Sequence, residues 1–251
     1  PFSVERTVAP IWRLSNQLQL TYPISSKTKI EVSARYSYEH IKNTIAVTNN
    51  GVITYSDGKE IHHDFNLNPV ITHNFNSKLK SALRLYATRF QSEQKLNTSV
   101  SSLYDDKLDH QFLRAESQTD YIFNNKINIT AGAGIINEGV KSTRYEVSSE
   151  RKLNTISYLF AQAEIKPTER FTLITGLRYD NNQLFAAAFS PKLAVMYKAG
   201  KKLKLNASIG RGFKAPDFRQ LYLSFTNTAA GSYSVFGTLE AQTQIERLKQ
   251  L

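Results

Sequence analysis

Two short groups of residues carry side chains that could bind a metal ion. The first is His62-His63-Asp64, and the second runs from Asp105 to His110 and includes Asp106 and Asp109. Successive side chains of a strand point to opposite faces, so His62 and Asp64 would share a face without the third ligand that a zinc site needs. The second group lacks the ligand spacing of a calcium-binding loop. We therefore interpret the first group as structural and the second as a solvated loop, and we predict no metal site and no cofactor.

Nucleophilic catalysis has little support in the sequence. The chain contains no cysteine, which excludes a cysteine nucleophile, a thiolate metal site and a disulfide scaffold. Serines are plentiful, but no Gly-x-Ser-x-Gly elbow occurs and no histidine follows His110. We predict that the chain is not an enzyme.

The elements that must position these residues are strands. Within residues 29–38, every second residue from Ile30 to Tyr38 is apolar or aromatic, and the residues between them are polar. This period of two is typical of a strand with two different faces. Segments of the same kind are 12–22, 29–38, 65–73, 78–90, 113–123, 127–136, 156–165, 171–180, 191–198 and 203–213. The pattern predicts an all-β chain of about ten strands.

The connections between these segments alternate between short and long. Short polar turns are expected at 23–27, 76–78, 124–126, 167–170 and 199–202. Longer connections are expected at 48–60, 91–107, 137–153, 181–188 and after residue 213. This alternation predicts an antiparallel up-and-down meander whose two ends face different environments, which is typical of transmembrane β-barrels of the outer membrane.

The two faces of the predicted strands differ in a way that suits a membrane. The polar face carries charged side chains, among them Arg35, Arg84, Glu116 and Arg178, whereas a small soluble barrel fills its interior with apolar side chains. Aromatic residues of the apolar face stand near both ends of the strands, as in the two girdles of a lipid-facing band. They are Tyr22, Tyr121, Phe123 and Phe171 near the short turns, and Tyr36, Tyr38, Tyr179 and Phe213 near the long connections. The alternative is that tyrosine and phenylalanine are simply good strand formers.

Charge and hydropathy limit the classes of partner. The chain has 251 residues and a formal net charge of +11, which suits nucleic acid, an anionic lipid surface or an acidic ligand. The basic residues occur mostly as singles along the strands, and Lys201-Lys202 is the only pair of adjacent lysines. Nucleic-acid-binding chains concentrate them in a stripe or tail, so we predict no nucleic-acid partner. No run of about 18 apolar residues occurs, which excludes a helical membrane protein.

Three motifs occur in order at hairpin spacing near the end of the chain. They are Gly-Leu-Arg-Tyr-Asp at 176–180, Ser-Pro-Lys-Leu at 190–193 and Gly-Arg-Gly-Phe-Lys-Ala-Pro-Asp-Phe-Arg-Gln-Leu-Tyr at 210–222. This ordered set resembles the barrel of TonB-dependent outer-membrane receptors. The residues that carry the last motif are Arg211, Phe213, Lys214, Ala215, Pro216, Asp217, Phe218, Arg219, Leu221 and Tyr222.

The resemblance implies a fold and a function. Such receptors are 22-stranded barrels in the bacterial outer membrane, filled by an N-terminal plug domain. They import ferric siderophores, haem or cobalamin with energy from the inner-membrane TonB complex. The resemblance thus implies the TonB complex, outer-membrane lipid or lipopolysaccharide, and a metal chelate or cobalamin as partners. Phe213 to Pro216 match the family's Phe-Arg-Ala-Pro element with lysine for arginine, but no histidine follows and 236–239 is a poor Asn-Pro-Asn-Leu box, which counts against a haem receptor.

Ten strands are too few for the whole barrel. We therefore expect residues 1–251 to be a central section of the barrel domain of a longer protein, without the plug domain. Strands are expected to about residue 213, and 214–251 are expected to form a long extracellular loop with a short helical tail from Leu239 to Leu251, where the apolar residues follow a helical period.

Aromatic residues of this predicted loop are the candidate ligand contacts. They are Tyr222, Phe225, Tyr233 and Phe236, which could equally pack the loop on itself. Two other functions share parts of the pattern. A passive porin or other ligand-binding barrel would have the same strands without a plug, and a soluble all-β carbohydrate-binding protein would bury the apolar faces in a sandwich core.

Overall fold

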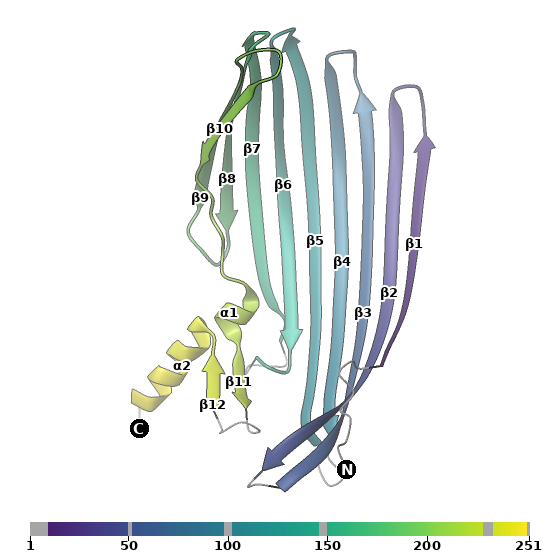
Figure 1. Cartoon of the computed structure of the whole chain (residues 1–251), viewed down its shortest axis with the longest axis vertical. Coiled ribbons are helices and arrows are strands. Elements are labelled where there is room, and N and C mark those ends of the chain that lie inside the picture. Colours follow the sequence, from purple (N-terminus) through teal and green to yellow (C-terminus); the bar gives the residue numbers. More distant parts are fainter. Residues whose placement is uncertain (1–9, 50–51, 98–101, 146–149, 228–232, 250–251) are drawn as a thin grey trace.

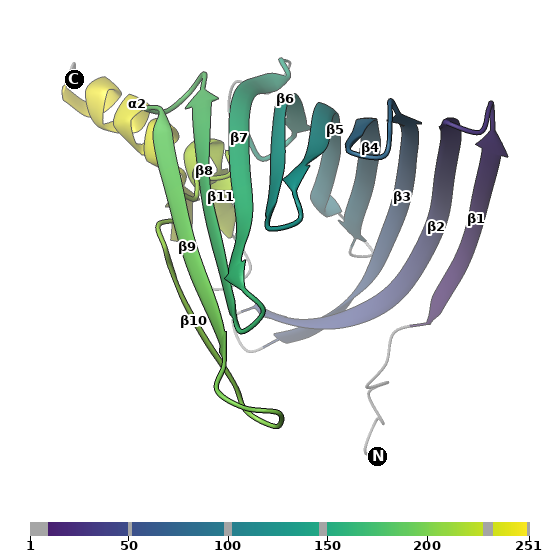
Figure 2. The same ribbon diagram turned by 90° about the horizontal axis from the view of Figure 1, so that it is seen from above.

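A single ten-stranded antiparallel sheet dominates the computed structural model, which describes residues 10–49, 52–97, 102–145, 150–227 and 233–249. Each strand pairs with the next one along the chain, in the order shown in Figure 1. The strands are β1 (Ile11–Pro23), β2 (Thr28–Asn49), β3 (Val52–Asn74), β4 (Leu79–Asn97), β5 (Ser102–Asn124), β6 (Ile127–Ser142), β7 (Lys152–Thr168), β8 (Phe171–Asn182), β9 (Ala188–Lys198) and β10 (Lys204–Gly210). Figure 2 shows that the sheet curves into an open arc. The prediction of an all-β, up-and-down, partial barrel is confirmed.

Side chains of the turn residues shape several of the short connections, which lie together at the upper end of the sheet in Figure 1. The Asn76 side-chain oxygen accepts hydrogen bonds from the amides of Lys78 and Leu79, at 2.8 and 2.9 Å. The Asn124 oxygen accepts one from the Lys126 amide at 2.8 Å. Asparagine favours tight turns because its side chain can replace a backbone acceptor in this way.

The strands extend further than the sequence predicted. Much of 48–60, 91–107 and 137–153, which were expected to be loops, continues the strands of β2 to β7. β2, β3 and β5 have 22, 23 and 23 residues, about twice the 9–11 residues that cross a bilayer. Their far parts carry polar residues on both faces, so the period of two disappears although the hydrogen-bonded ladder continues. The tenth strand, in contrast, ends at Gly210, and Phe213 lies outside it.

One face of the sheet is more enclosed than the other. We call it the inner face. Buried strand residues share it, among them Thr72, Ala82, Ser92, Val140, Tyr158 and Asn182. The opposite face, the outer face, exposes large apolar side chains, including Leu14, Leu85, Leu113, Leu159 and Leu177. Curvature brings inner side chains together and spreads outer ones apart. An exposed apolar band of this size is expected where lipid covers a sheet.

Four shorter elements follow the sheet. They are α1 (Phe218–Tyr222), the β11 (Ser224–Asn227) and β12 (Tyr233–Phe236) hairpin, and α2 (Thr238–Lys249). They lie at the end of the sheet opposite the short turns, at the bottom of Figure 1. α2 occupies the segment where the sequence predicted a helical tail. Neither of the helices in the described part of the chain is long and apolar enough to cross a membrane.

Candidate functional site

The motif after β10 builds a capped helical turn. Asp217 is the N-cap of α1, and its carboxylate accepts a hydrogen bond from the Gln220 amide at 2.8 Å. The Gln220 side-chain oxygen accepts one from the Asp217 amide at 3.1 Å. This reciprocal pair is a capping box, which satisfies amides that a helix start leaves unpaired. Residues 211–216 form no regular element, and most of them are exposed.

Buried apolar contacts attach α1 to the inner face of the sheet. Phe218 packs with Val140 of β6 and with Tyr145, and all three side chains are buried. The backbone adds one link toward the sheet, because Leu223 forms a β-bridge with Tyr145, and one link within the last part of the chain, because the Gly237 amide donates to the Leu223 carbonyl at 2.7 Å. A side chain at Gly237 would overlap the backbone of Leu221, so this approach requires glycine. The last part of the chain is thereby held against the sheet.

A cavity of about 390 Å³ lies where α1 meets the inner face. We call it the inner cavity. Its floor comes from β3 to β6, and its rim comes from Arg144, Tyr145 and α1. The lining residues are His62, Phe90, Ser92, Gln94, Asp106, Leu108, Ser142, Arg144, Tyr145, Arg219 and Leu223. Two guanidinium groups against one carboxylate make its lining cationic, which suits an anionic ligand.

Burial governs the electrostatics at the rim. The Arg144 Nε lies 2.8 Å from Asp106 Oδ2. Burial, followed by the neighbouring charge of Arg219, lowers the pKa of the Arg144 guanidinium below its ordinary value, which leaves it charged at neutral pH. Burial is also the main reason that the pKa of Tyr145 rises to about 12. The Tyr145 hydroxyl therefore stays protonated and neutral, and it does not offset the positive charge of the arginines in the cavity lining.

The four predicted aromatic residues do not form one platform. Tyr222 packs beside Phe218 and Tyr145, with ring centroids 6.1 and 6.2 Å away. Phe225 lies under the Arg144 guanidinium, 5.1 Å from ring centroid to Cζ. Tyr233 shares the Phe225 face of the β11–β12 hairpin, whereas Phe236 lies on its other face. Tyr222 thus packs the loop, and Phe225 is the predicted aromatic residue that contacts the rim of the inner cavity through Arg144.

Further from the loops, a polar row crosses the inner face of the sheet. Glu116 accepts a hydrogen bond from the Tyr158 hydroxyl at 2.7 Å and lies 3.5 Å from Arg84 Nη1. Arg178 stacks on the Tyr158 ring, 3.9 Å from its centroid, and binds Asp180 through both Nε and Nη2. The side of this network that faces away from the sheet needs water or a polar neighbour, because covering charged groups with apolar atoms costs free energy.

The possible metal ligands of the sequence have other partners. His62 and Asp64 lie on the inner face and His63 on the outer face. His62 is 3.3 Å from Glu39 and Asp64 is 2.8 Å from Arg35. Asp106 and Asp109 point to opposite faces of β5. Among the described residues, no three histidine, aspartate or glutamate side chains come together to hold a metal ion.

Sequence reasoning did not bring the residues of the inner cavity together, because it named Asp106 only as a possible metal ligand and Arg219 only within the last motif, and it did not name Arg144. Arg144 and Asp106 lie in segments that look like solvated loops, and Arg219 lies 75 positions beyond Arg144 in the chain. Only the fold brings them together. The sequence does contain one signal for α1, because Asp217 and Gln220 have the spacing of a capping box at the start of a helix.

Comparison with known proteins agrees with this architecture. A curated relative, the vitamin B12 transporter BtuB of Photobacterium profundum, is 26% identical over 163 residues, which cover 54% of this chain and 26% of that protein. Among solved structures, a variant of the ferric enterobactin receptor PfeA of Pseudomonas aeruginosa aligns with a TM-score of 0.70 at 16% identity, over 88% of this chain and 36% of that one. The siderophore receptor PirA of Acinetobacter baumannii aligns with a TM-score of 0.68 at 13% identity, over 85% and 36%. The matched region is well under half of each of these proteins.

The family assignment comes from a match along the sequence. The family described as TonB dependent receptor-like, beta-barrel matches residues 6–245. The match includes all ten strands of the sheet and the elements that line the inner cavity. The chain therefore belongs to the TonB-dependent receptor-like β-barrel family.

Proposed function

We propose that the protein containing this chain is an outer-membrane receptor for TonB-coupled uptake of an anionic metal chelate, with a ferric siderophore as the first candidate. The observation that carries the proposal is the inner cavity, in which Arg144 and Arg219 meet on the inner face of a barrel-type sheet. Guanidinium groups bind carboxylate and other planar oxygen ligands through paired hydrogen bonds. Family membership supplies the transport class.

The proposed mechanism uses binding and release, without covalent chemistry in the barrel. The loop end of the sheet captures the ligand from outside the cell. The plug domain, which contacts the TonB complex, is then remodelled so that the ligand passes inward. In this scheme the polar row around Glu116 and Tyr158 faces the plug or water inside the barrel, and the outer face contacts lipid. The protein acts as a transporter and not as an enzyme.

Cobalamin is the second candidate ligand. The relative that favours it is the vitamin B12 transporter BtuB, with 26% identity over 163 residues. A competition experiment separates the candidates. Purified full-length receptor is incubated with a labelled ferric siderophore or with labelled cobalamin, and each is displaced by the other in unlabelled form. The ligand bound with the lower Kd is the transported class.

The variant Arg219→Gln tests the role of the inner cavity. The Arg219 side chain lines the cavity, and hydrogen bonds to charged groups are worth about 1.5–3 kcal/mol. We expect the Kd of the ferric siderophore to rise about tenfold or more. The matched control is Arg211→Gln, which removes an exposed arginine of the same motif outside the cavity lining and should leave the Kd unchanged. Equal affinities of the Arg219→Gln variant and the unaltered receptor would contradict this assignment.

A further inference from the structure

The histidines of the chain are divided between the two faces of the sheet. Histidine is the side chain that ordinarily changes its charge between pH 5 and pH 8, and the chain contains five. In the strand register, His40, His63 and His73 lie on the outer face, whereas His62 and His110 lie on the inner face. Of the two inner histidines, His62 lines the inner cavity.

His62 lies between two carboxylates. Its Nδ1 is 3.3 Å from Glu39 Oε1, and its Nε2 is 3.7 Å from Glu60 Oε2. The ring packs beside Phe90, with the two ring centroids 5.6 Å apart, and the side chain remains partly exposed. A protonated imidazole donates from both nitrogens, whereas the neutral ring donates from only one. The position of the two carboxylates therefore suits the protonated ring.

Charged groups approach His62 from most of the elements around it. The residues of β4 beside it, Phe90, Ser92 and Gln94, carry no charge. Among the described residues, the charged groups around it are the carboxylates of Glu39, Glu60, Asp64 and Asp106 and the guanidinium groups of Arg13, Arg35, Arg144 and Arg219. Four negative charges thus balance four positive charges, so protonation of His62 changes the net charge of this set from zero to +1.

Two other groups near the cavity also respond to acid. Burial raises the pKa of the Asp106 carboxyl above its ordinary value, so its protonation would remove a negative charge from the cavity lining. His110 has its Nε2 2.7 Å from Glu138 Oε1, but neither of these two residues lines the cavity. Acid therefore makes the inner cavity more cationic, and His62 is the histidine that does so from within its lining.

We infer that His62 is a further ligand-binding residue of the inner cavity, whose positive charge in acid makes an anionic chelate bind more tightly as the pH falls. This inference rests on the proposed function, because it requires an anionic ligand in the inner cavity. The imidazolium donates a charge-assisted hydrogen bond to the anion, which the neutral ring does not. The charged fraction of a histidine rises between pH 8 and pH 6, so the Kd falls over the same interval.

Two variants fix the charge of residue 62 at either limit. His62→Gln is neutral at every pH, and His62→Arg is always positive. The Kd of the full-length receptor is measured at pH 8 and pH 6 for ferric enterobactin and ferric citrate, which are anionic, and for cyanocobalamin, which has no net charge. Between these pH values, the Kd of an anionic chelate should fall about fivefold more in the unaltered receptor than in His62→Gln. His62→Arg at pH 8 should bind as tightly as the unaltered receptor at pH 6.

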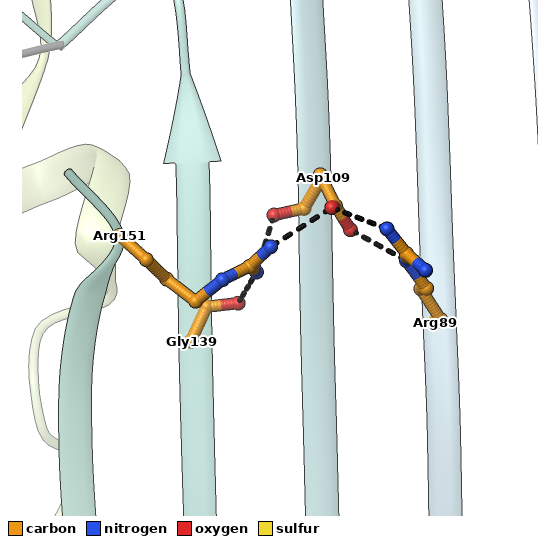
Figure 3. Close-up of polar contacts among 4 residues, drawn as sticks. All are labelled: Arg89, Asp109, Gly139 and Arg151. Atoms are coloured by element: carbon orange, nitrogen blue, oxygen red, sulfur yellow. Dashed lines mark hydrogen bonds and ion pairs between the residues drawn. The ribbon is translucent and has the colours of Figure 1, made fainter. Parts of the chain in front are cut away.

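His63→Gln is the matched control. His63 follows His62 directly, but it lies on the outer face of the sheet, in one row with Gln91 and Asp109. Figure 3 shows the charged groups of that face, where Arg89 and Arg151 each donate to Asp109 at 2.8 Å. This row faces away from the inner cavity, so His63→Gln should keep the full pH dependence of the unaltered receptor.

Proton uptake gives a second measurement. Calorimetry at pH 7 in two buffers of different ionisation enthalpy should show that chelate binding takes up protons in the unaltered receptor, and fewer in His62→Gln. Equal pH dependence of the Kd in these two proteins would overturn the inference and leave the proposed function standing. A loss of affinity by one factor at both pH values would also overturn it, because it would indicate a structural role for His62. A receptor that binds only cyanocobalamin, or none of the three probes, would overturn the siderophore proposal together with this inference.

Discussion

Gly134 shows how one missing side chain shapes the inner face. It stands opposite Tyr158 in the register of β6 and β7, and the Tyr158 ring lies over it. A Cβ at this position would overlap that ring and lie 2.9 Å from the Ala115 carbonyl oxygen. Glycine in a strand often marks such a close approach. The space above Gly134 therefore allows Tyr158 to reach Glu116 and to stack under Arg178.

Gly134→Ala should destabilise the barrel. The added methyl group must push the Tyr158 ring away, and overpacking of this kind costs about 1–3 kcal/mol. We expect a lower urea midpoint for unfolding of the full-length receptor in lipid vesicles. The control is Gly200→Ala in the β9–β10 turn, where a Cβ has open space within 4 Å and the midpoint should not move. Equal midpoints for Gly134→Ala and the unaltered protein would refute this account.

The strands show what the sequence could and could not predict. Strand order, the two faces and the short turns follow from local signals, namely the period of two and the short polar turns. Strand lengths do not, because β4 and β5 continue through Gln91–Asn97 and Asp105–Asp109, where most residues of both faces are polar. Beyond the lipid no face needs to be apolar, so a paired strand has the composition of a loop. The inner cavity was missed for a different reason, since Arg144 and Arg219 meet only through the tertiary fold.

The capping box makes α1 a second element that can be tested. Asp217→Ala removes the side chain that accepts from the Gln220 amide, and losing such a cap costs about 1 kcal/mol. Hydrogen exchange of the Gln220 and Leu221 amides should accelerate about fivefold. Ligand affinity should fall as well, because α1 positions Arg219 at the inner cavity.

Asp217→Asn is the conservative counterpart of that change. Asparagine caps a helix about as well as aspartate, so exchange of both amides should remain near that of the unaltered protein. If Asp217→Ala leaves the exchange rates unchanged, the capping box does not hold α1 in place.

The sheet as a whole has an outer face for lipid, a charged inner face and a loop end with a cationic cavity. A passive pore also needs the first two features. The inner cavity and membership of the TonB-dependent receptor-like family favour the proposed receptor over a passive pore. A receptor of this kind concentrates its ligand with supplied energy, whereas a pore only equilibrates it.

Energised uptake is therefore the most direct test. Cells that express the full-length receptor are supplied with a ferric siderophore carrying radioactive iron, or with labelled cobalamin, with the TonB complex intact or deleted. The account predicts that the cells accumulate one of these ligands above its external concentration only when the TonB complex is intact. Equal entry of the ligand with and without the TonB complex would contradict the account and identify a passive barrel.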